Sequence, residues 1–439
     1  MSGNVCVGID IGTTSVKAVA ADDDGNVVAR ARVPHRLVVP AADRLEHDAA
    51  QAWRRGPVRA LRSLGLDADP LAVAVSAMVP SLTAVDRRGR PVAPGLLYGD
   101  ARGRGDAQDR RGSDAGESLE FLRWMTTSFP EARGYWPAQA VANHALGGVA
   151  SVDGATAFSM HPLFGLEGWD EAVVKSAGAQ LDQLPSVGNN GQPIGSVGSA
   201  ILGASAIDAM GEQIVAGTDE PGDVLVICGT TLIVWVVVTE PVTVDGLWTI
   251  PSFTPGRFLV GGPSNAGGLF LNWAARLFGR ARGAVAPARV PVFSPYVRGE
   301  RVPLHDPDRR AAIDGLDLTH DAASMRRAAY EASGFAARHI IELSGARHRR
   351  IVATGGGTRD VEWMQALADA TGVDVDVVGV AEGGALGAAW FARMAAGLET
   401  AMHDAARWAR TSHTVSPDPA WRSPVDDRYA RYVELARRA

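Results

Sequence analysis

Cysteine, lysine and long apolar runs are scarce in this chain of 439 residues. Its two cysteines, Cys6 and Cys228, each lie within a short apolar run, where a free thiol behaves as a small hydrophobic side chain. This pattern excludes a disulfide framework and a cysteine-based zinc site. Lysine occurs only at Lys17 and Lys175, so nearly all the positive charge is arginine and the position of Lys17 stands out.

No stretch of the sequence is apolar for long enough to cross a membrane. The longest uncharged apolar segment, residues 224–238, is interrupted by Gly-Thr-Thr and is shorter than the ~20 residues that a bilayer span needs. The first residues carry no basic segment and reach an acid at Asp10, which is not typical of a secretory signal. The charge balance of −6 disfavours a general nucleic-acid surface. We expect a soluble cytoplasmic protein with neither membrane nor nucleic acid as a partner.

The length and composition are those of a globular protein with more than one domain. At roughly 150 residues per domain the chain has room for two or three, and its 46% hydrophobic and 21% charged residues argue against disorder. Strand-like and helical segments alternate, which indicates an α/β fold with helices on both faces of its sheets. The predicted helices are 48–64, 115–128, 166–178, 203–217, 266–279, 321–345, 360–372 and 383–397, and the shorter predicted strands are 71–77, 82–86, 257–262, 349–354 and 375–379.

Two segments far apart in the chain share one pattern, in which a strand, a Gly-Thr-Thr turn and a second strand follow one another. The first segment turns at Gly12 and continues through an acidic turn at 22–26 into a third strand. The second segment turns at Gly229. This repetition predicts an internally duplicated architecture, with chance similarity as the alternative. We predict the boundary between the halves at residues 217–223.

The first turn combines the groups that the terminal phosphates of a nucleotide require. Gly12 allows close backbone approach, and Thr13 and Thr14 supply hydroxyl and amide donors. Lys17 supplies a positive charge, and Asp10 can hold a magnesium ion through water. The turn therefore predicts phosphate binding, with an ordinary hairpin as the alternative.

The second turn and a third glycine-rich segment supply the rest of a nucleotide site. Gly229 and Thr230 repeat the donors of the first turn, and a phosphate clamp made of two facing hairpins needs two such turns. In residues 351–360 a strand passes through three glycines into a helix, where bare backbone can lie against a ribose or an adenine. Small residues at 382–389 permit close helix packing, which is also a sufficient explanation for them.

These motifs, in this order, resemble the FGGY family of carbohydrate kinases and, within it, the xylulokinase-like branch. The resemblance covers essentially the whole chain. It implies two actin-like (ribonuclease H-like) ATPase domains with the active site in the cleft between them. Residues 1–219 would form the sugar-binding domain and residues 220–439 the ATP-binding domain. The motifs that carry the resemblance are 8–14, 97–102, 169–170, 184–185, 195–197, 207–208, 221–223, 229–231, 295–301, 306–307, 355–357 and 385–389.

The resemblance implies ATP and Mg²⁺ as cofactors and assigns roles to single residues. Asp208 matches the aspartate that takes the proton from the substrate hydroxyl, although a solvated helix acid is the alternative. Asn272 matches an adenosine contact, and an exposed helix residue is an equally good interpretation. The expected phosphate ligands are Gly12, Thr13, Thr14, Lys17, Gly229 and Thr230, the adenosine contacts Gly268, Asn272, Gly355, Gly356 and Asp360, the substrate contacts Ala77, Met78, Asp100 and Asp208, and the magnesium ligand Asp10.

The expected sugar pocket departs from the xylulokinase pattern. Val79 stands where those enzymes carry a histidine, and Tyr98 stands where they carry a tryptophan. Valine cannot pair with a sugar hydroxyl, and a hydroxyl left unpaired costs about 1–3 kcal/mol. Arg102 and Arg104 follow Asp100 and either attract an acidic substrate or belong to an arginine-rich surface loop, which we favour.

We therefore expect an ATP-dependent kinase that phosphorylates a hydroxyl of a small carbohydrate, with D-xylulose or a related ketose or polyol as the first candidate. A gluconokinase-like or polyol kinase is the alternative within the class. A degenerate member that binds without turnover is another alternative. An actin-like ATPase switch is disfavoured because such proteins lack an acid in the position of Asp208. A homodimer is left open, because relatives often dimerise but no surface stripe here indicates one.

Overall fold

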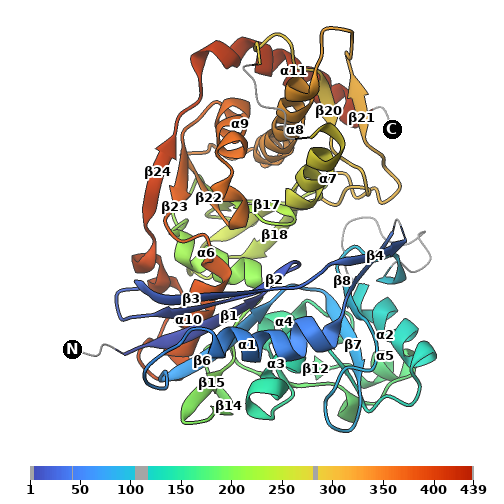
Figure 1. Ribbon diagram of the computed structural model, residues 1–439, viewed down its shortest axis with the longest axis vertical. Helices are drawn as coiled ribbons and strands as arrows, with labels where there is room; N and C mark the ends of the chain where they lie inside the picture. Colours follow the sequence, from blue (N-terminus) through green and yellow to red (C-terminus); the bar gives the residue numbers. More distant parts are fainter. Residues whose placement is uncertain (1–3, 42, 104–116, 280–284, 438–439) are drawn as a thin grey trace. The chain divides into compact units, whose positions relative to one another are not determined.

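The computed structural model describes residues 4–41, 43–103, 117–279 and 285–437. They form two compact units, of which unit 1 comprises Met1–Val215 with Glu382–Trp408 and unit 2 comprises Ala216–Ala381 with Ala409–Ala439. This partition differs from the predicted division into 1–219 and 220–439. The chain returns to unit 1 after residue 381, so that a helix near its red end lies beside the blue strands (Figure 1).

The central sheet of unit 1 has six strands, which are β1 (Cys6–Ile11), β2 (Ser15–Ala21), β3 (Val27–Pro34), β6 (Ala72–Ala77), β14 (Pro193–Val197) and β15 (Ala200–Gly203). Their order is β14-β15-β6-β1-β2-β3. Strands β1, β2 and β3 form an antiparallel meander, whereas β6 and β15 run parallel to β1. The carboxyl ends of β1, β6 and β15 therefore meet at one edge, where open α/β sheets carry their ligands.

Strand β1 is buried on both faces, and its alternate residues face different layers. The odd-numbered residues from Val7 to Ile11 belong to the core of unit 1. Gly8 lies against α10 (Gly383–Ala395), where a Cβ atom would be 1.9 Å from the carbonyl oxygen of Ala385. Only glycine allows the helix to approach so closely. The small residues of α10 thus have the packing role that the sequence left as an alternative.

Unit 1 also contains smaller sheets that are separate from the central one. A second sheet has the order β4-β5-β8-β7-β9, and two short ladders pair β10 with β13 and β11 with β12. The strands are β4 (Val38–Ala41), β5 (Arg44–His47), β7 (Ser81–Val85), β8 (Gly95–Leu97), β9 (Gly134–Trp136), β10 (Ser151–Asp153), β11 (Phe164–Gly165), β12 (Gly168–Trp169) and β13 (Ser186–Gly188). The helices are η1 (Ala50–Arg55), α1 (Gly56–Arg62), η2 (Ala101–Gly103), α2 (Glu117–Ser128), α3 (Ala138–Gly147), α4 (Gly154–Phe158), α5 (Glu171–Ser176), η4 (Leu181–Gln183), α6 (Asp208–Ala216), α10 and η6 (His403–Trp408).

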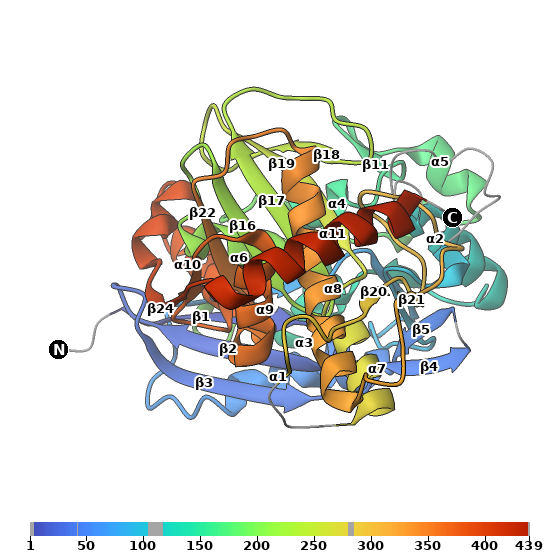
Figure 2. The ribbon, with the colours of Figure 1, turned by 90° about the horizontal axis from the view of Figure 1, so that it is seen from above.

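Unit 2 contains a seven-stranded sheet in the order β18-β19-β17-β16-β22-β23-β24. Helices α8 and α9 pack against each other in its apolar core, and α11 runs across α8 (Figure 2). The strands are β16 (Asp223–Cys228), β17 (Leu232–Val238), β18 (Trp248–Pro251), β19 (Phe258–Ser264), β20 (Val292–Ser294), β21 (Ala312–Asp314), β22 (Arg350–Thr354), β23 (Val375–Val378) and β24 (Thr411–Val415). The helices are α7 (Gly268–Phe278), α8 (Ala322–Leu343), η5 (Gly356–Arg359), α9 (Val361–Thr371), η7 (Pro419–Trp421) and α11 (Arg422–Arg437).

The two central sheets share one pairing pattern. In unit 1 the antiparallel meander β3-β2-β1 is followed by the parallel strands β6 and β15 and by the antiparallel edge strand β14. In unit 2 the meander β19-β17-β16 is followed by the parallel strands β22 and β23 and by the antiparallel strand β24. The predicted α/β fold is confirmed, and the repeated Gly-Thr-Thr turns fall at the same place in both sheets.

Both cysteines are free and fully buried, as their apolar surroundings predicted. Cys6 lies in β1 and Cys228 ends β16. Burial raises the pKa of Cys6 to about 11, so its thiol stays protonated and unreactive at neutral pH.

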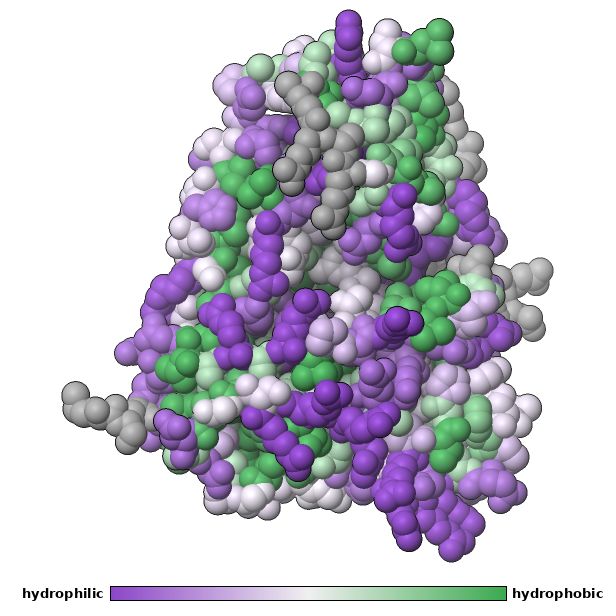
Figure 3. Space-filling view, in the orientation of Figure 1, coloured by the Kyte–Doolittle hydropathy of each residue, from purple (hydrophilic) through white to green (hydrophobic). Residues whose placement is uncertain are grey.

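The surface of the described residues mixes polar and apolar side chains. Figure 3 shows hydrophilic and hydrophobic residues interspersed over the visible face. None of the helices in the described ranges combines the length and the apolar character that a membrane crossing requires.

Candidate active site

The first Gly-Thr-Thr turn joins β1 to β2 and places an acid opposite a lysine. The register of the two strands pairs Asp10 with Lys17, and the lysine Nζ lies 3.5 Å from Asp10 Oδ2. The amide of Gly12 closes the turn by donating to the carbonyl oxygen of Ser15 at 3.1 Å. Thr14 is exposed at the tip. The turn therefore presents Thr14 to solvent above a partly buried ion pair.

Asp10 is 4% exposed, and its second oxygen, Oδ1, has no hydrogen-bond partner among the described residues. Burial raises the pKa of Asp10, and the Lys17 ammonium opposes that effect. Burial by itself would lower the pKa of Lys17, but the negative charges of Asp10, Glu212 and Glu382 raise it above its ordinary value. Lys17 therefore stays charged and interacts electrostatically with several acidic side chains.

Asp208 begins helix α6 beside the first turn, because three parallel strands end there together. Ala77, the last residue of β6, pairs with Ile11 on one side and forms a bridge with Ile207 on the other. Ser76 Oγ and Ser205 Oγ form a hydrogen bond of 2.9 Å one step earlier. The structure thus brings Asp208 to the same sheet edge as the first turn.

A stack of glycines fixes the position of helix α6. A Cβ on Gly387 of α10 would lie 2.2 Å from the carbonyl oxygen of Gly211 on α6. A Cβ on Gly211 would lie 2.9 Å from the carbonyl oxygen of Gly384. Since α10 also rests directly on Gly8 of β1, backbone lies on backbone from β1 through α10 to α6. Asp208 is therefore held by contacts that a side chain at any of these positions would break.

Asp208 is partly exposed, and its pKa is shifted into the neutral range. Burial and then the negative charge of Asp10 raise the pKa of Asp208 to about 7, Glu212 adds to the effect, and Lys17 opposes it. The backbone amide of Ala209 donates to Asp208 Oδ1 at 2.7 Å. A carboxylate with a pKa near the operating pH is well matched to general acid–base catalysis.

Sequence reasoning missed Glu212, which is 6% exposed and lies four residues after Asp208. Residues four apart share a helix face, so the spacing places both acids on one side of α6. That spacing was the available signal. Glu212 makes the surroundings of Asp208 more negative and helps to hold Lys17 in its charged form.

The hydroxyl of Thr13 does not lie at the open face of the turn. Thr13 is 6% exposed, and its Oγ1 forms a hydrogen bond of 2.7 Å with the phenol oxygen of Tyr98. The expectation that both threonine hydroxyls are presented to a phosphate is therefore corrected. Thr14 keeps that position, whereas the side chain of Thr13 links the turn to the residue that replaces the family's tryptophan.

The side chains expected to contact substrate are mostly buried. Ala77 is 1% exposed, and Met78 is 2% exposed and belongs to the core of unit 1. Val79, which follows them, is half-buried. The predicted contacts through the side chains of Ala77 and Met78 are therefore corrected, because both face inward from the end of β6.

Asp100 holds an internal ion cluster. It is fully buried, and its oxygens accept hydrogen bonds from the backbone amide of Leu45 at 2.6 Å and from Arg102 Nε and Nη2 at 2.8 and 2.7 Å. Arg102 also pairs with Glu46 at 2.6 Å. The interpretation of Arg102 as part of a surface loop is wrong, since it is enclosed between two carboxylates. Asp100 makes its hydrogen bonds within unit 1, and its expected contact with substrate stays a prediction. Arg104 lies outside the described residues.

In unit 2 the second Gly-Thr-Thr turn packs directly on the start of helix α7. The amides of Gly268 and Leu269 donate to the carbonyl oxygens of Gly229 and Thr230 at 2.9 and 3.0 Å. A Cβ on Gly268 would lie 2.8 Å from the Gly229 oxygen, so glycine is required there for packing. Asn272 follows one helical turn later and is exposed on the same face.

The third glycine segment follows β22, the parallel neighbour of β16. Gly355 has φ +91° and lies against the backbone of Cys228, whereas Gly356 is exposed, with open space where a Cβ would be. Bare backbone at Gly356 is thus accessible to a ligand. Asp360 caps helix α9, with Oδ1 accepting from the amide of Glu362 at 3.1 Å and Oδ2 accepting from Tyr330 Oη at 2.6 Å. Both of its oxygens accept hydrogen bonds within unit 2, and its expected role as an adenosine contact stays a prediction.

Glu300, a second residue without a predicted role, forms hydrogen bonds with the segment that precedes α7. It is 3% exposed and accepts hydrogen bonds from Ser264 Oγ at 2.7 Å and from the amide of Asn265 at 2.8 Å. Burial raises the pKa of Glu300 to about 7. Its position in the Gly-Glu-Arg motif at 299–301 was the available signal.

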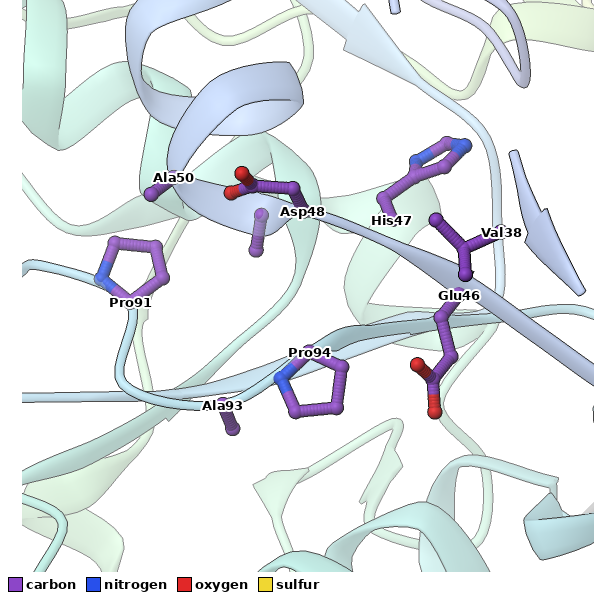
Figure 4. Close-up of a pocket in the computed structure, with 9 residues that line it drawn as sticks. Val38, Glu46, His47, Asp48, Ala50, Pro91, Ala93 and Pro94 are labelled. Atoms are coloured by element: carbon purple, nitrogen blue, oxygen red, sulfur yellow. The ribbon is translucent and has the colours of Figure 1, made fainter. Parts of the chain in front are cut away.

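A separate pocket of about 330 Å³ lies in unit 1 near the ends of β5 and β8 (Figure 4). Glu46 and His47 project from β5 to opposite sides in this view. None of the predicted substrate contacts lines the pocket. The lining residues are Val38, Glu46, His47, Asp48, Ala49, Ala50, Pro91, Ala93 and Pro94.

Comparison with known families identifies both halves of the chain. Residues 5–109 match the N-terminal domain of the FGGY family of carbohydrate kinases, and residues 224–396 match its C-terminal domain. Both Gly-Thr-Thr turns fall within the matched segments.

Named relatives and solved structures are similar over nearly the whole chain. A gluconokinase of Bacillus subtilis (strain 168) is 25% identical, with 87% of this chain and 86% of the relative aligned. A xylulose kinase of Streptomyces rubiginosus is 28% identical, with 92% of this chain and 91% of the relative aligned. The crystal structure of a gluconate kinase from Lactobacillus acidophilus superimposes with a TM-score of 0.79 at 21% identity, covering 98% of this chain and 96% of that one. This structural likeness shows the fold.

Proposed function

Because the chain belongs to the FGGY family of carbohydrate kinases, we propose that it transfers the γ-phosphoryl group of ATP to a hydroxyl group of a small carbohydrate. The expected family and the expected enzyme class, a phosphotransferase, are confirmed at the level of the family. The donor, the acceptor and the roles of single residues belong to the proposal.

The observation that supports the proposal most is the placement of Asp208. This carboxyl starts α6 at the edge where β1, β6 and β15 end, and its pKa is about 7. We propose that Asp208 accepts the proton of the acceptor hydroxyl as the new phosphorus–oxygen bond forms. Positioning and charge neutralisation supply most of the remaining rate enhancement in phosphoryl transfer.

The proposed nucleotide contacts come from both turns. Thr14 and Lys17 of the first turn, with the backbone around Gly12 and Thr13, would bind phosphate oxygens. Gly229 and Thr230 would do so from the second turn, since each turn is closed by a glycine amide and leaves its threonine segment at the surface end of a strand. Gly268, Asn272, Gly355 and Gly356 are proposed adenosine contacts.

The residues around Asp10 fit a magnesium ion that is bound mainly through a nucleotide and water. Asp10 offers a buried carboxylate oxygen that has no partner in the described structure. No cluster of three or more histidine, cysteine or acidic side chains suited to a metal occurs in the described ranges. Mg²⁺ commonly uses one or two carboxylates together with phosphate oxygens. The ion would neutralise phosphate charge next to Asp10, Asp208 and Glu212, where Lys17 is the balancing cation.

For the acceptor we propose D-xylulose or a related ketose or polyol, with gluconate as the alternative. Relatives named as xylulose kinase and gluconokinase are similar at comparable identity, so the class of acceptor is a small polyhydroxylated compound. Val79 favours an acceptor without a hydroxyl to be paired at that position. The half-buried valine lies two residues beyond Ala77, the last residue of β6, next to the edge that carries Asp208.

The test measures ADP release by the native protein and by Asp208→Asn with a panel of pentuloses, hexuloses, polyols and aldonates. A kinase shows release that one class of acceptor stimulates and that the substitution abolishes while nucleotide binding persists. Binding of nucleotide without stimulation by any acceptor would instead support the degenerate alternative. Full activity of Asp208→Asn would remove the proposed base.

A second variant tests the acceptor assignment by itself. Val79→His restores the histidine of the xylulokinase pattern at the end of β6. We expect it to improve kcat/KM for D-xylulose by about tenfold, the effect of one hydrogen bond of about 1.4 kcal/mol. Val79→Leu is the control, because it changes volume without adding a hydrogen-bonding group. Equal effects of both variants would contradict the interpretation of this position.

A further inference from the structure

His47 lies directly behind the first phosphate-binding turn, and its two ring nitrogens make two different hydrogen bonds. Nε2 lies 2.8 Å from the carbonyl oxygen of Thr13. Nδ1 accepts a hydrogen bond of 3.0 Å from the indole Nε1 of Trp53. His47 is 1% exposed and Trp53 is fully buried, so water does not compete for either contact.

These contacts fix one tautomer of the imidazole. An indole N–H only donates, so Nδ1 must be the unprotonated nitrogen. Nε2 then carries the hydrogen and donates it to the Thr13 carbonyl. Burial lowers the pKa of His47 to about 3, with a smaller contribution from His35, so this neutral form persists over the physiological range.

The same turn is held at two further points. The backbone amide of His35 donates to the Thr14 carbonyl at 3.0 Å, and the rings of His35 and His47 meet edge to face at 4.5 Å. Tyr98 holds the hydroxyl of Thr13. The exposed face of Thr14 is therefore backed by contacts to both residues of the Thr13–Thr14 pair.

We infer that His47 is a positioning residue that orients the first turn for the phosphates of the nucleotide, acting through the Thr13 carbonyl and through the hydrogen bond from Trp53. The inference rests on the proposed function, since it assigns a task to a turn that is itself proposed to bind phosphate. The imidazole does not touch the nucleotide. It fixes the plane of the Thr13–Thr14 peptide, and so the direction in which the amide of Thr14 points.

The decisive variants are His47→Gln and His47→Leu. Glutamine carries one acceptor and one donor group, so it can replace both hydrogen bonds, whereas leucine fills the space and makes neither. We expect His47→Leu to raise the KM for ATP about tenfold with little change in the KM for the acceptor, and His47→Gln to restore ATP binding to within about threefold of native. His144→Leu is the control, because His144 is a half-buried histidine beside Trp136 in the same unit, away from the turn.

Binding without turnover separates this inference from the proposed function. Titration calorimetry with a non-hydrolysable ATP analogue and with AMP requires no acceptor. His47→Leu should weaken the analogue about tenfold and leave AMP unchanged, because AMP lacks the terminal phosphates. If the native protein bound the analogue but phosphorylated no acceptor, the proposed function would be wrong. The affinities of the native protein and of His47→Leu for the analogue and for AMP would still test the role of His47.

Several outcomes would overturn the inference. They are unchanged affinity of His47→Leu for the analogue, an equal loss of affinity for AMP, or failure of His47→Gln to do better than His47→Leu. If His47→Leu did not fold, Trp53→Phe would take its place, because it keeps an aromatic ring and removes only the donor to Nδ1. We expect Trp53→Phe to weaken the analogue about threefold relative to AMP, and no such difference would refute the positioning role.

Discussion

The two Gly-Thr-Thr turns occupy the same place in two sheets of the same pattern, yet they differ in charge. In unit 1 the pair of residues next to the last pair of the hairpin is Asp10 and Lys17. In unit 2 the corresponding pair is Ile227 and Ile233. One turn therefore lies on a partly buried ion pair, and the other lies on an apolar pair.

The two units therefore share a pairing pattern but differ in the chemistry of the residues beneath the turn. In unit 1 Lys17 pairs with Asp10 and also interacts electrostatically with Asp208 and Glu212, so a cation and a proton acceptor are available there. The second turn offers backbone amides, hydroxyls and the start of α7, which suit the recognition of a phosphate and a nucleoside without titrating groups. We therefore propose that proton transfer takes place in unit 1 and that nucleotide recognition is the main task of the second turn.

The largest effect is expected from removing the carboxyl group of Asp208 in unit 1. Asp208→Asn keeps the shape of the side chain but cannot accept the proton, so kcat should fall by about 10²–10⁴-fold. Nucleotide affinity, measured by calorimetry, should stay within about twofold of native. Asp182→Asn, a substitution of an exposed acid in the same unit, is the control and should retain native activity. A kcat within tenfold of native would contradict the role of Asp208 as the proton acceptor.

The second prediction introduces an Asp–Lys pair, like that of the first turn, at the corresponding strand positions beside the second turn. Ile227 is 6% exposed, so Ile227→Asp buries an unpaired carboxylate and should lower the free energy of unfolding by about 3–5 kcal/mol. Adding Ile233→Lys supplies the cross-strand partner that Lys17 is for Asp10 and should recover part of the loss. Urea denaturation of both single variants and of the double variant measures the coupling. A double variant no more stable than Ile227→Asp would mean that the ion pair of unit 1 depends on Glu212 and Glu382 as well.

The third prediction compares a glycine that close helix packing requires with a glycine that has open space beside it. Gly387→Ala forces a Cβ to 2.2 Å from the Gly211 oxygen, so we expect a loss of about 1–3 kcal/mol in stability and a lower kcat, because α6 carries Asp208. Gly356→Ala meets open space and should change stability by less than about 0.5 kcal/mol. It should still weaken nucleotide binding if the backbone there faces the ligand. Thermal unfolding together with ATP titration distinguishes the two, and equal destabilisation would contradict the glycine stack.

The smallest effects concern pH. Since the pKa of Asp208 is about 7, kcat/KM should fall about tenfold per pH unit below that value, as the base becomes protonated. A raised carboxyl pKa stabilises the fold at low pH, and this contribution is lost as pH rises from about 4 through about 7. Asp208→Asn should therefore be more stable than native at pH 8 by about 1–2 kcal/mol, and no more stable at pH 4. An activity profile that stays flat down to pH 5 would contradict the shifted pKa.

The sequence predicted the elements with strong periodicity and missed those without it. Residues 322–343 and 361–371 are helical almost as the periodicity indicated. The predicted helix at 203–217 instead begins at Asp208, because residues 200–203 pair with β6 as strand β15. Helices α3 and α11 were not predicted, since packing in the core rather than a regular apolar stripe holds their buried residues.

The candidate site was predicted by residue type more accurately than by role. Asp10 and Lys17 come together as the turn chemistry predicted, Asp208 lies at the same sheet edge as the resemblance implied, and Gly229, Thr230 and Gly268 come together in unit 2. The burial of Met78 and the partners of Asp100 depend on strands and loops that only folding brings near. His47 carried no local signal, because its role depends on hydrogen bonds with Thr13, 34 residues away in the sequence, and with the buried Trp53.

Short patterns of backbone freedom, charge and periodicity in the sequence were enough to predict the α/β class and the two glycine-threonine turns, whereas the family and the role of Asp208 came from the resemblance of the motifs to known kinases. Tertiary structure alone decided that residues 382–408 return to the first unit, that α10 spaces α6 from β1 by bare backbone, and that Asp208 has a neutral pKa. These properties arise from distances between segments far apart in the chain, and from the loss of water around charges that the folded sheet brings together.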